Sequence, residues 1–268
     1  GFGGIAAAVA LRRKGIDNLT IIEADDGVGG TWRRNTYPGA ACDIQSHLYS
    51  FSFAQNRSWS RPYARQPEIL AYLESVADAM DLRRHLMLGT RLREARWNSA
   101  TARWDLLVDR SGDDVTMTVD VVVSAVGLFG APKLPDIPGL ADFGGPVMHT
   151  AQWDSGVELA GEKVAVIGTG ASAVQVVPEL AKVAGSVTVF QRTPPWMVPK
   201  DDRAYSPAEL ALFRRNPLAV RRSRWKIWKL QHDFTANRGD DPTAAARSRV
   251  ATSFLERTVA DEQLRSAL

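Results

Sequence analysis

The sequence of 268 residues lacks the features that mark several classes of protein. It contains a single cysteine, Cys42, so it has no internal disulfide and no Cys-x-x-Cys redox centre, which excludes the dithiol flavin reductases. It has no run of about 18 uncharged apolar residues and no signal-peptide pattern, so we expect a cytoplasmic protein without a membrane span. Three histidines, His47, His85 and His232, show no metal-ligand spacing, so we expect no metal site.

The composition is that of a globular protein, with 45% hydrophobic and 24% charged residues. The length favours two domains. The net charge of +3 is modest, and most of the excess lies in residues 214–229, RRNPLAVRRSRWKIWK. This segment predicts a solvated helix face whose Trp and Ile side chains pack inward. No nucleic-acid recognition module accompanies it, so we expect no nucleic-acid partner.

The chain begins with a glycine-rich segment, GFGGIAAAVALRRKG, that predicts a helix ending near Gly15. The following NLTIIEA predicts a short strand that ends in Glu23. Gly1 and Gly4 fit the second and third glycines of the dinucleotide fingerprint G-x-G-x-x-G, and Glu23 fits the acid that binds the ribose hydroxyls. The alternative is a disordered glycine-rich start. Since the first glycine and its strand do not precede Gly1, we interpret the chain as an internal piece of a longer protein.

The middle of the chain combines a loop, a helix and strands. DDGVGGTWRRNTYPGAACD (25–43) predicts a loop, and the periodicity over 67–80 predicts a helix with Pro67 at its first position. VDVVVSAVG predicts a fully buried strand that ends at Gly127, followed by an extended Pro-rich linker, APKLPDIPGLADFGG. Three alternating segments predict a small antiparallel meander: 91–97, 103–109 and 115–126.

A second nucleotide unit is complete in EKVAVIGTGASAVQVVPELAKVAGSVTVFQRT. A strand, Gly168, Gly170, Ala173, a helix and a second strand follow one another in order, with Ala173 in place of the third glycine. Backbone N–H groups at the start of the helix can face a pyrophosphate. Beyond Pro194 the pattern predicts helices over 206–214, 217–234 and 242–267.

The two units end in different side chains. Glu23 can accept both ribose hydroxyls but would repel a 2′-phosphate, which favours FAD or NAD. The second unit ends in Gln191, Arg192 and Thr193, and a guanidinium with a hydroxyl favours the 2′-phosphate of NADPH. The alternative for Arg192 is an exposed charge at a strand end. Two nucleotide sites in tandem indicate hydride transfer between cofactors, and FAD with NADPH is the simplest pair.

These patterns predict an α/β protein with two dinucleotide-binding (Rossmann-like) domains, both incomplete, a small antiparallel meander and a C-terminal helical segment. The predicted domains are an FAD-binding domain over 1–141, an interdomain linker over 142–160, the start of an NADPH-binding domain over 161–199 and a helical insertion over 200–268.

Two motifs resemble those of one family. GGTWRRNTYPGAACD resembles the A/G-G-x-W-x-x-x-x-Y-P-G-x-x-x-D signature of Baeyer–Villiger monooxygenases, and FGGPVMHTAQWD resembles their F-x-G-x-x-x-H-x-x-x-W-P/D fingerprint. The Trp-Asp end favours this ketone-oxidising branch over flavin N-oxygenating relatives. The matching residues are Gly30, Trp32, Tyr37, Pro38, Gly39 and Asp43, and then Phe143, Gly145, His149, Trp153 and Asp154.

The resemblance implies an enzyme in which NADPH reduces FAD, and a C4a-peroxyflavin formed with O2 converts a ketone to an ester or lactone. NADP+ is expected to stay bound and to shield this intermediate. Two alternatives stay open: oxygenation of N or S atoms, and an inactive truncated nucleotide-binding fragment. We expect the isolated chain to bind FAD weakly and to have no oxygenase activity. The substrate pocket is expected to be built largely by segments outside this sequence.

The resemblance also assigns roles to residues. Asp43, Trp153 and His149 are the expected catalytic residues: Asp43 would orient and tune an arginine that in the family lies beyond the helical segment, past Leu268. His149 and Trp153 would move as the NADPH domain shifts, without His149 acting as a general base. A loop-capping Asp43 and a structural His149 are the alternatives. FAD contacts are expected from Gly1, Gly4, Glu23, Gly30, Thr31, Trp32, Arg33, Asp43 and Tyr49. NADPH contacts are expected from Gly168, Thr169, Gly170, Ala171, Ser172, Ala173, Arg192 and Thr193.

Overall fold

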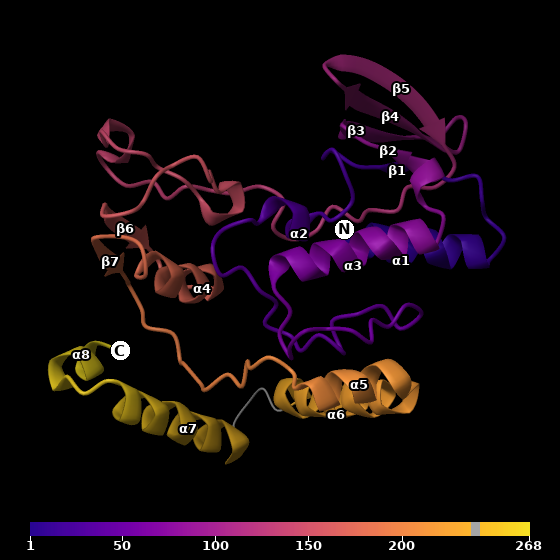
Figure 1. The fold of residues 1–268 in the computed structure, drawn as a ribbon. Coiled ribbons are helices and arrows are strands. Elements are labelled where there is room, and N and C mark those ends of the chain that lie inside the picture. Colours follow the sequence, from indigo (N-terminus) through magenta and orange to yellow (C-terminus); the bar gives the residue numbers. More distant parts are fainter. Residues whose placement is uncertain (237–241) are drawn as a thin grey trace. The chain divides into compact units, whose positions relative to one another are not determined.

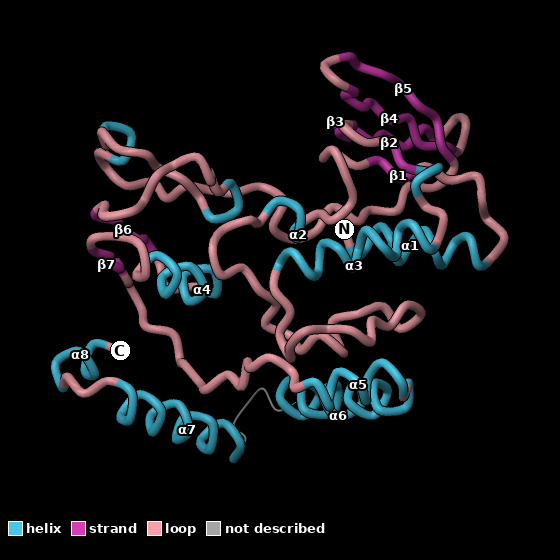
Figure 2. The backbone as a smooth tube through the Cα atoms, in the orientation of Figure 1, coloured by secondary structure: helices cyan, strands magenta, loops and turns pink. Residues whose placement is uncertain are grey.

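The computed structural model describes residues 1–236 and 242–268 (Figures 1 and 2). Contacts group the chain into two compact units, one formed by 1–36 and 66–153, the other by 37–65 and 154–268. The predicted division into an FAD domain, a linker, an NADPH domain and an insertion is by function rather than by contact, and it stays a prediction.

Two helices form the core of the first unit. α1 (Phe2–Arg13) ends at Lys14 and Gly15, as predicted, and Gly15 has a φ of +81°. α3 (Gln66–Ala79) buries residues 69, 72, 73, 76 and 77, the i, i+3, i+4 spacing of one helix face. Figure 1 shows the two helices side by side, and Phe2 of α1 contacts Tyr72 of α3 with ring centroids 6.3 Å apart.

The strand after α1 is shorter than the predicted NLTIIEA segment. β1 (Ile21–Ile22) pairs in parallel, among the described strands, with β2 (Leu86–Met87). The predicted buried strand that ends at Gly127 is wrong, because residues 121–127 form no strand and Val121 and Val126 are 73% and 79% exposed. β-branched residues favour an extended backbone, but a strand also requires a neighbour to pair its N–H and C=O groups. No described strand lies beside this segment.

The antiparallel meander of the first unit is confirmed. β3 (Thr90–Asn98), β4 (Arg103–Arg110) and β5 (Asp113–Val119) pair in that order, and β5 ends seven residues earlier than predicted. The short helices of this unit, which the sequence did not predict, are α2 (Thr31–Arg34), η1 (Arg83–His85), η2 (Leu140–Asp142) and η3 (Thr150–Gln152).

The second unit contains the βαβ element that the sequence predicted. β6 (Lys163–Ile167) pairs in parallel with β7 (Ser186–Phe190), and α4 (Ala171–Leu180) connects them. Val176 and Leu180 of α4 are buried. The strands, the glycine loop and the helix of this βαβ element are contiguous in sequence.

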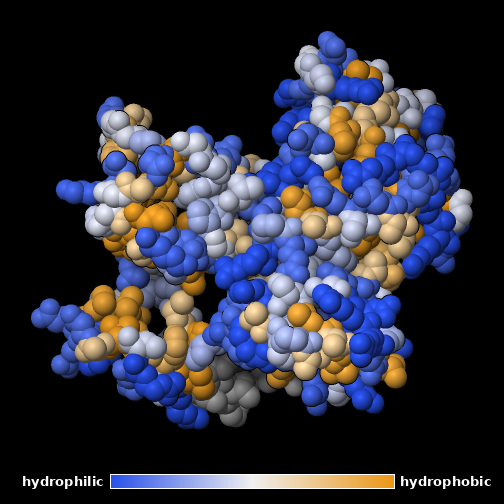
Figure 3. Space-filling view, viewed as in Figure 1, coloured by the Kyte–Doolittle hydropathy of each residue, from blue (hydrophilic) through white to orange (hydrophobic). Residues whose placement is uncertain are grey.

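Helices complete the second unit. They are α5 (Pro207–Arg215), α6 (Pro217–Ala236), α7 (Pro242–Thr258) and α8 (Glu262–Ala267). The predicted helices are therefore confirmed, with a break before Glu262. The predicted inward packing of α6 holds for Ile227, which is 5% exposed, but is wrong for Trp225 and Trp228, which are 60% and 51% exposed. Lys229 lies over the ring of Trp225, 5.8 Å from its centre. Figure 3 shows hydrophilic and hydrophobic side chains mixed over α5 and α6.

Candidate functional site

The first glycine loop lies at the start of α1, beside the glycine that precedes α2. Gly1 is the N-cap of α1 and Gly30 is the N-cap of α2. A Cβ atom at Gly30, where φ is +56°, would come within 3.0 Å of the Cα atom of Gly1, so this close approach requires glycine. The N–H groups of the first turn of α1, including that of Gly4, have no partner within the helix and can bind an anion such as a pyrophosphate.

Glu23 lies beside this loop, directly after β1. Its side chain is 15% exposed, and its Oε2 atom is 3.8 Å from the backbone nitrogen of Gly1. Its Oε1 atom accepts a hydrogen bond of 3.2 Å from the N–H of Asp25, whose carboxylate pairs with Arg34 at 2.8 Å. The structure thus brings the predicted ribose acceptor next to the predicted pyrophosphate loop, the arrangement that a dinucleotide requires.

The three predicted FAD-binding residues of α2 differ in exposure. Thr31 is exposed, whereas Trp32 is half-buried and its carbonyl accepts a hydrogen bond from the side chain of Gln66. The guanidinium of Arg33 pairs with Glu74 of α3 at 2.6 Å and donates to the carbonyl of Val28 at 2.9 Å. Arg33 therefore ties α2 to α3, and its predicted contact with FAD stays a prediction.

Residues 37–43, the second half of the GGTWRRNTYPGAACD motif, are held by Gln175 of α4. This residue was not identified from the sequence. Its side-chain oxygen accepts hydrogen bonds from the Tyr37 hydroxyl at 2.9 Å and from the N–H of Ala41 at 3.2 Å. Its side-chain nitrogen donates to the carbonyl of Ala41 at 3.0 Å and to Asp43 at 3.1 Å. A single amide thus makes four hydrogen bonds to residues 37–43. One signal in the sequence could have indicated Gln175. It is a polar residue two positions after Ala173, on a helix that packs closely against its neighbouring strand.

Asp43 receives a second contact that the sequence did not suggest. Its Oδ1 atom is 3.1 Å from the Nζ atom of Lys200, and its side chain is 58% exposed. The carboxylate of Asp43 therefore interacts with a neutral donor, Gln175, and with a cation, Lys200. The adjacent Cys42 is buried, and burial raises the pKa of its thiol to about 11, so it stays protonated and fits the predicted packing role.

The segment that carries Tyr49 is anchored on α6. The guanidinium of Arg224 donates three hydrogen bonds of 2.9 to 3.0 Å to backbone carbonyls of residues 47–50. The imidazole of His47 lies 2.8 Å from the Ser223 hydroxyl, and burial lowers the pKa of His47 to about 4. Tyr49, half-buried, is therefore placed by a neutral histidine and an arginine rather than by a regular element.

The second glycine loop runs from the end of β6 into α4. Gly170 is the N-cap of α4, and a Cβ atom placed there would meet no described atom within 4 Å. Open space in front of a helix N-terminus is where a pyrophosphate can approach the backbone. Thr169 donates a 3.4 Å hydrogen bond to the carbonyl of Thr193, so the loop and the end of β7 lie together. Both Arg192 and Thr193 are exposed there.

Two of the other predicted residues of this loop line an apolar cavity. They are Thr169 and Ala173, and the cavity has a volume of about 290 Å³; Ala171 is exposed and Ser172 is half-buried. The remaining lining residues, mostly apolar, come from α4, β7, the segment after it, α7 and the end of the chain, and they include Trp196 and Phe254. The cavity offers apolar surface beside the loop for a planar ring.

The FGGPVMHTAQWD segment has no extended regular structure. His149 is the N-cap of η3, and its Nδ1 atom accepts a 3.0 Å hydrogen bond from the N–H of Ala151. Trp153 is half-buried, and Asp154 accepts a hydrogen bond from the N–H of Gly156 at 2.8 Å. These contacts are local, as in a structural histidine, so the role of His149 in coupling the domains stays a prediction.

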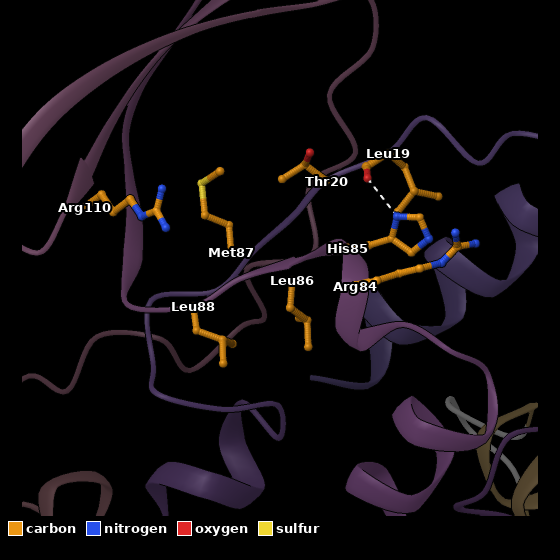
Figure 4. Close-up of a pocket in the computed structure, with 8 residues that line it drawn as sticks. All are labelled: Leu19, Thr20, Arg84, His85, Leu86, Met87, Leu88 and Arg110. Atoms are coloured by element: carbon orange, nitrogen blue, oxygen red, sulfur yellow. Dashed lines mark hydrogen bonds between the residues drawn. The ribbon is translucent and has the colours of Figure 1, made fainter.

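A further pocket in the first unit is lined by none of the predicted site residues (Figure 4). It has a volume of about 410 Å³ and is lined by Leu19, Thr20, Arg84, His85, Leu86, Met87, Leu88 and Arg110. Figure 4 shows His85 bonded to the carbonyl of Leu19, at 3.1 Å, and Arg84 pairs with Asp17 at 2.8 Å, so both basic groups have protein partners.

Within residues 1–236 and 242–268, no group of three or more His, Cys, Asp or Glu residues is placed to hold a metal ion. In the same ranges, no helix has the length and apolar character needed to cross a membrane.

Comparison with known proteins gives the family. The family described as pyridine nucleotide-disulphide oxidoreductase matches residues 1–214. A Baeyer–Villiger monooxygenase of Streptomyces coelicolor is 49% identical over 231 residues, which cover 86% of this chain and 44% of that relative. The chain thus spans less than half the length of this relative.

Solved structures agree with this result. Cyclohexanone monooxygenase from Rhodococcus sp. Phi1 bound to NADP+ is 42% identical, with a TM-score of 0.73 over 80% of this chain and 41% of that chain. OTEMO in complex with FAD and NADP is 35% identical, with a TM-score of 0.74 over 81% of this chain and 42% of that chain. The predicted fold class and the predicted resemblance are therefore confirmed. The chain belongs to the pyridine nucleotide-disulphide oxidoreductase family and, within it, is similar to Baeyer–Villiger monooxygenases over most of its length.

Proposed function

We propose that this chain carries the two nucleotide-binding sites of an FAD- and NADPH-dependent monooxygenase that converts ketones to esters or lactones. One ketone, one O2, one NADPH and one proton would give one ester, one NADP+ and one water. The observation that carries the proposal is the difference in charge between two strand ends, with Glu23 after β1 and Arg192 after β7. A carboxylate suits a ribose with free hydroxyls, and a guanidinium suits a 2′-phosphate.

The FAD site would be built by the first glycine loop and the GGTWRRNTYPGAACD motif. The first turn of α1 would bind the pyrophosphate, and Glu23 would accept the ribose hydroxyls. The close approach of Gly1 and Gly30 supports this assignment, because a side chain at Gly30 would collide with the loop. Residues 1–141 would form this FAD domain, as the sequence predicts.

The NADPH site would be built by the second glycine loop over 161–199. The N-terminus of α4 would bind the pyrophosphate, where Gly170 leaves open space, and Arg192 with Thr193 would bind the 2′-phosphate. Residues 142–160 would link the two sites, and 200–268 would be an insertion. Complexes of the similar OTEMO with FAD and NADP support the choice of cofactors.

FAD, when bound, supplies the two-electron redox chemistry and the activation of O2. The protein's own residues would position the partners and exclude water. Asp43 would present a fixed negative charge to a neighbouring cation, and His149 and Trp153 would connect the two nucleotide domains. We place this chemistry in the cytoplasm, with a small-molecule ketone and O2 as partners.

The main test uses the purified protein that carries this chain. NADPH and 18O2 are supplied with cyclic, linear and aryl ketones, and products are identified by mass spectrometry. We expect esters or lactones with one 18O atom per molecule. Consumption of NADPH and O2 without any ester or lactone would refute ketone oxidation, and sulfoxides or N-oxides as the sole products would favour heteroatom oxygenation instead.

A second test concerns the choice of nicotinamide cofactor. Arg192→Ala should raise the KM for NADPH about tenfold, because one charge-assisted contact to the 2′-phosphate is lost. The KM for NADH should change little. Arg215→Ala, which removes another positive charge of the same unit, is the matched control. An equal change in KM for NADPH and NADH would show that Arg192 does not bind the 2′-phosphate.

A further inference from the structure

Lys200 makes three contacts around Asp43, from a position 157 residues further along the chain. Its Nζ atom is 3.1 Å from the Oδ1 atom of Asp43 and 3.4 Å from the carbonyl oxygen of Cys42. The same atom lies 4.3 Å from the centre of the Tyr63 ring, within the range of a cation–π contact. The ammonium group is thus held by a carboxylate, a carbonyl and a ring face at once.

The segment that carries Lys200 is fixed to residues 60–65. The N–H of Tyr205 donates to the carbonyl of Ser60 at 2.9 Å, and Arg61 pairs with Asp202 at 3.3 Å. These two contacts, one through the backbone and one through a side chain, fix the segment that follows Lys200. Lys200 is therefore placed by the segment that carries it.

Residues 60–65 are in turn fixed to the segment that contains Asp43. The N–H of Cys42 donates to the carbonyl of Ala64 at 3.0 Å, and the N–H of Ser46 donates to the carbonyl of Pro62 at 2.6 Å. Asp43 lies between these two bonded positions. Its backbone and the segment that carries Lys200 are thus both fixed to the same stretch of chain, all within the second unit.

A pre-positioned ion pair differs in effect from a mobile surface pair. The side chains of Lys200 and Asp43 are 37% and 58% exposed, so the pair contributes little to folding. Gln175 contacts the Oδ1 atom of Asp43 through a neutral amide, whereas Lys200 brings a cation to the same atom. Lys200 can therefore orient the carboxylate of Asp43 by charge.

We propose that Lys200 is a positioning residue for Asp43, which holds the carboxylate of Asp43 in one orientation. This inference rests on the proposed function, in which Asp43 presents a negative charge at the flavin site. The effect on the reaction would pass through Asp43, and Lys200 itself would touch neither the substrate nor the cofactor.

The contact itself can be tested without cofactor or turnover. The protein is treated briefly with acetic anhydride, and acetylation of each lysine is measured by mass spectrometry. Asp43→Asn should raise the acetylation rate of Lys200 about threefold, because loss of the ion pair frees the side chain to meet the reagent. Lys182, which pairs with Glu179 at 2.5 Å, is the internal control and should not change. An unchanged rate at Lys200 would overturn the proposal.

The effect on the reaction is tested by the kinetics of ketone oxidation. Lys200→Met should lower kcat about tenfold, because the carboxylate of Asp43 loses the cation that orients it. The KM for NADPH should change less than about twofold, and Lys200→Arg should restore most of kcat because it keeps the charge. Lys182→Met is the matched control. If Lys200→Met folds poorly, Lys200→Gln serves as the neutral variant.

An unchanged kcat in Lys200→Met and Lys200→Gln, or an equal fall of kcat in Lys200→Arg, would refute the positioning role. If the unmodified protein oxidises no ketone, the proposed function fails, while the acetylation experiment still decides whether the pair exists.

Discussion

The two halves of the GGTWRRNTYPGAACD motif are held by different parts of the molecule. Residues 30–34 are fixed within the first unit by α3, through Gln66 and Glu74. Residues 37–43 are fixed within the second unit, through the four hydrogen bonds of Gln175. The chain passes from one unit to the other between residues 36 and 37. The motif is contiguous in sequence, but its two halves belong to different units and are held by different side chains.

The first prediction concerns residues 37–43, at the position where they approach α4 most closely. Gly39 has a φ of +82°, and a Cβ atom there would collide with the carbonyl oxygen of Gln175. Gly39→Ala should lower the free energy of unfolding by about 4 kcal/mol, the sum of backbone strain and overpacking. The measurement is urea unfolding of the protein that carries this chain.

Gly139 provides the control for this substitution. It has the same φ of +82°, but a Cβ atom there would meet nothing within 4 Å. Gly139→Ala should therefore cost only the backbone strain, about 1 kcal/mol. Equal losses at the two glycines would mean that the contact between Gly39 and α4 is not tight.

The second prediction compares the two glutamines. Gln175→Leu leaves the Tyr37 hydroxyl and the backbone groups of Ala41 without partners, so we expect a loss of about 3 kcal/mol in unfolding free energy. Gln66→Leu removes one hydrogen bond to the carbonyl of Trp32, and we expect a loss of about 1 kcal/mol. Similar losses would show that the two halves of the motif are held equally.

The third prediction concerns pH, which should affect the second unit through His47. Burial lowers the pKa of His47 from 6.5 to about 4. Below pH 6.5 the unfolded chain binds a proton that the folded protein does not, so stability falls as the pH falls from 6.5 toward 4. By pH 5 this contribution should reach about 2 kcal/mol.

The variant that checks this prediction is His47→Gln. It should be less stable at pH 7.5 but lose about 2 kcal/mol less between pH 7.5 and pH 5 than the unmodified protein. The matched substitution at an exposed histidine, His232→Gln, should keep the original slope. The same slope in the His47 variant would show that His47 is not the group responsible.

The sequence predicted the parts of the fold whose interactions are local. The second fingerprint was predictable because β6, the glycine loop, α4 and β7 are contiguous, and the helix at 66–79 because its apolar residues fall on one face. The meander was predictable from alternation and from turns between neighbouring strands. The segment 121–127 was not, because its apolar residues report a preference for strand but cannot report whether a partner strand lies beside it.

The candidate site divides in the same way. The proximity of Gly1 and Glu23 could be predicted, because a fingerprint fixes their spacing. Gly30 comes from the GGTWRRNTYPGAACD motif, and the structure places it beside Gly1; that the three residues bind FAD stays a prediction. Gln175 and Lys200 could not be predicted, because their bonds to Asp43 join residues 132 and 157 positions apart. Periodicity and spacing describe one segment at a time. A motif therefore gives no indication of a side chain that contacts it from a distant segment.

The fourth prediction has the smallest effect and concerns the first half of the motif. Glu74→Gln removes the charge that pairs with Arg33, but Arg33 keeps its bond to Val28 and its contact with Asp26 at 3.1 Å. The pair is partly exposed, so we expect a loss of only about 0.5 kcal/mol, which decreases further in 1 M salt. Asp26→Asn, at a side chain that is 88% exposed, should have no measurable effect. A loss as large as that of Gln175→Leu would mean that charge at Arg33 holds the first half as firmly as neutral hydrogen bonds hold the second.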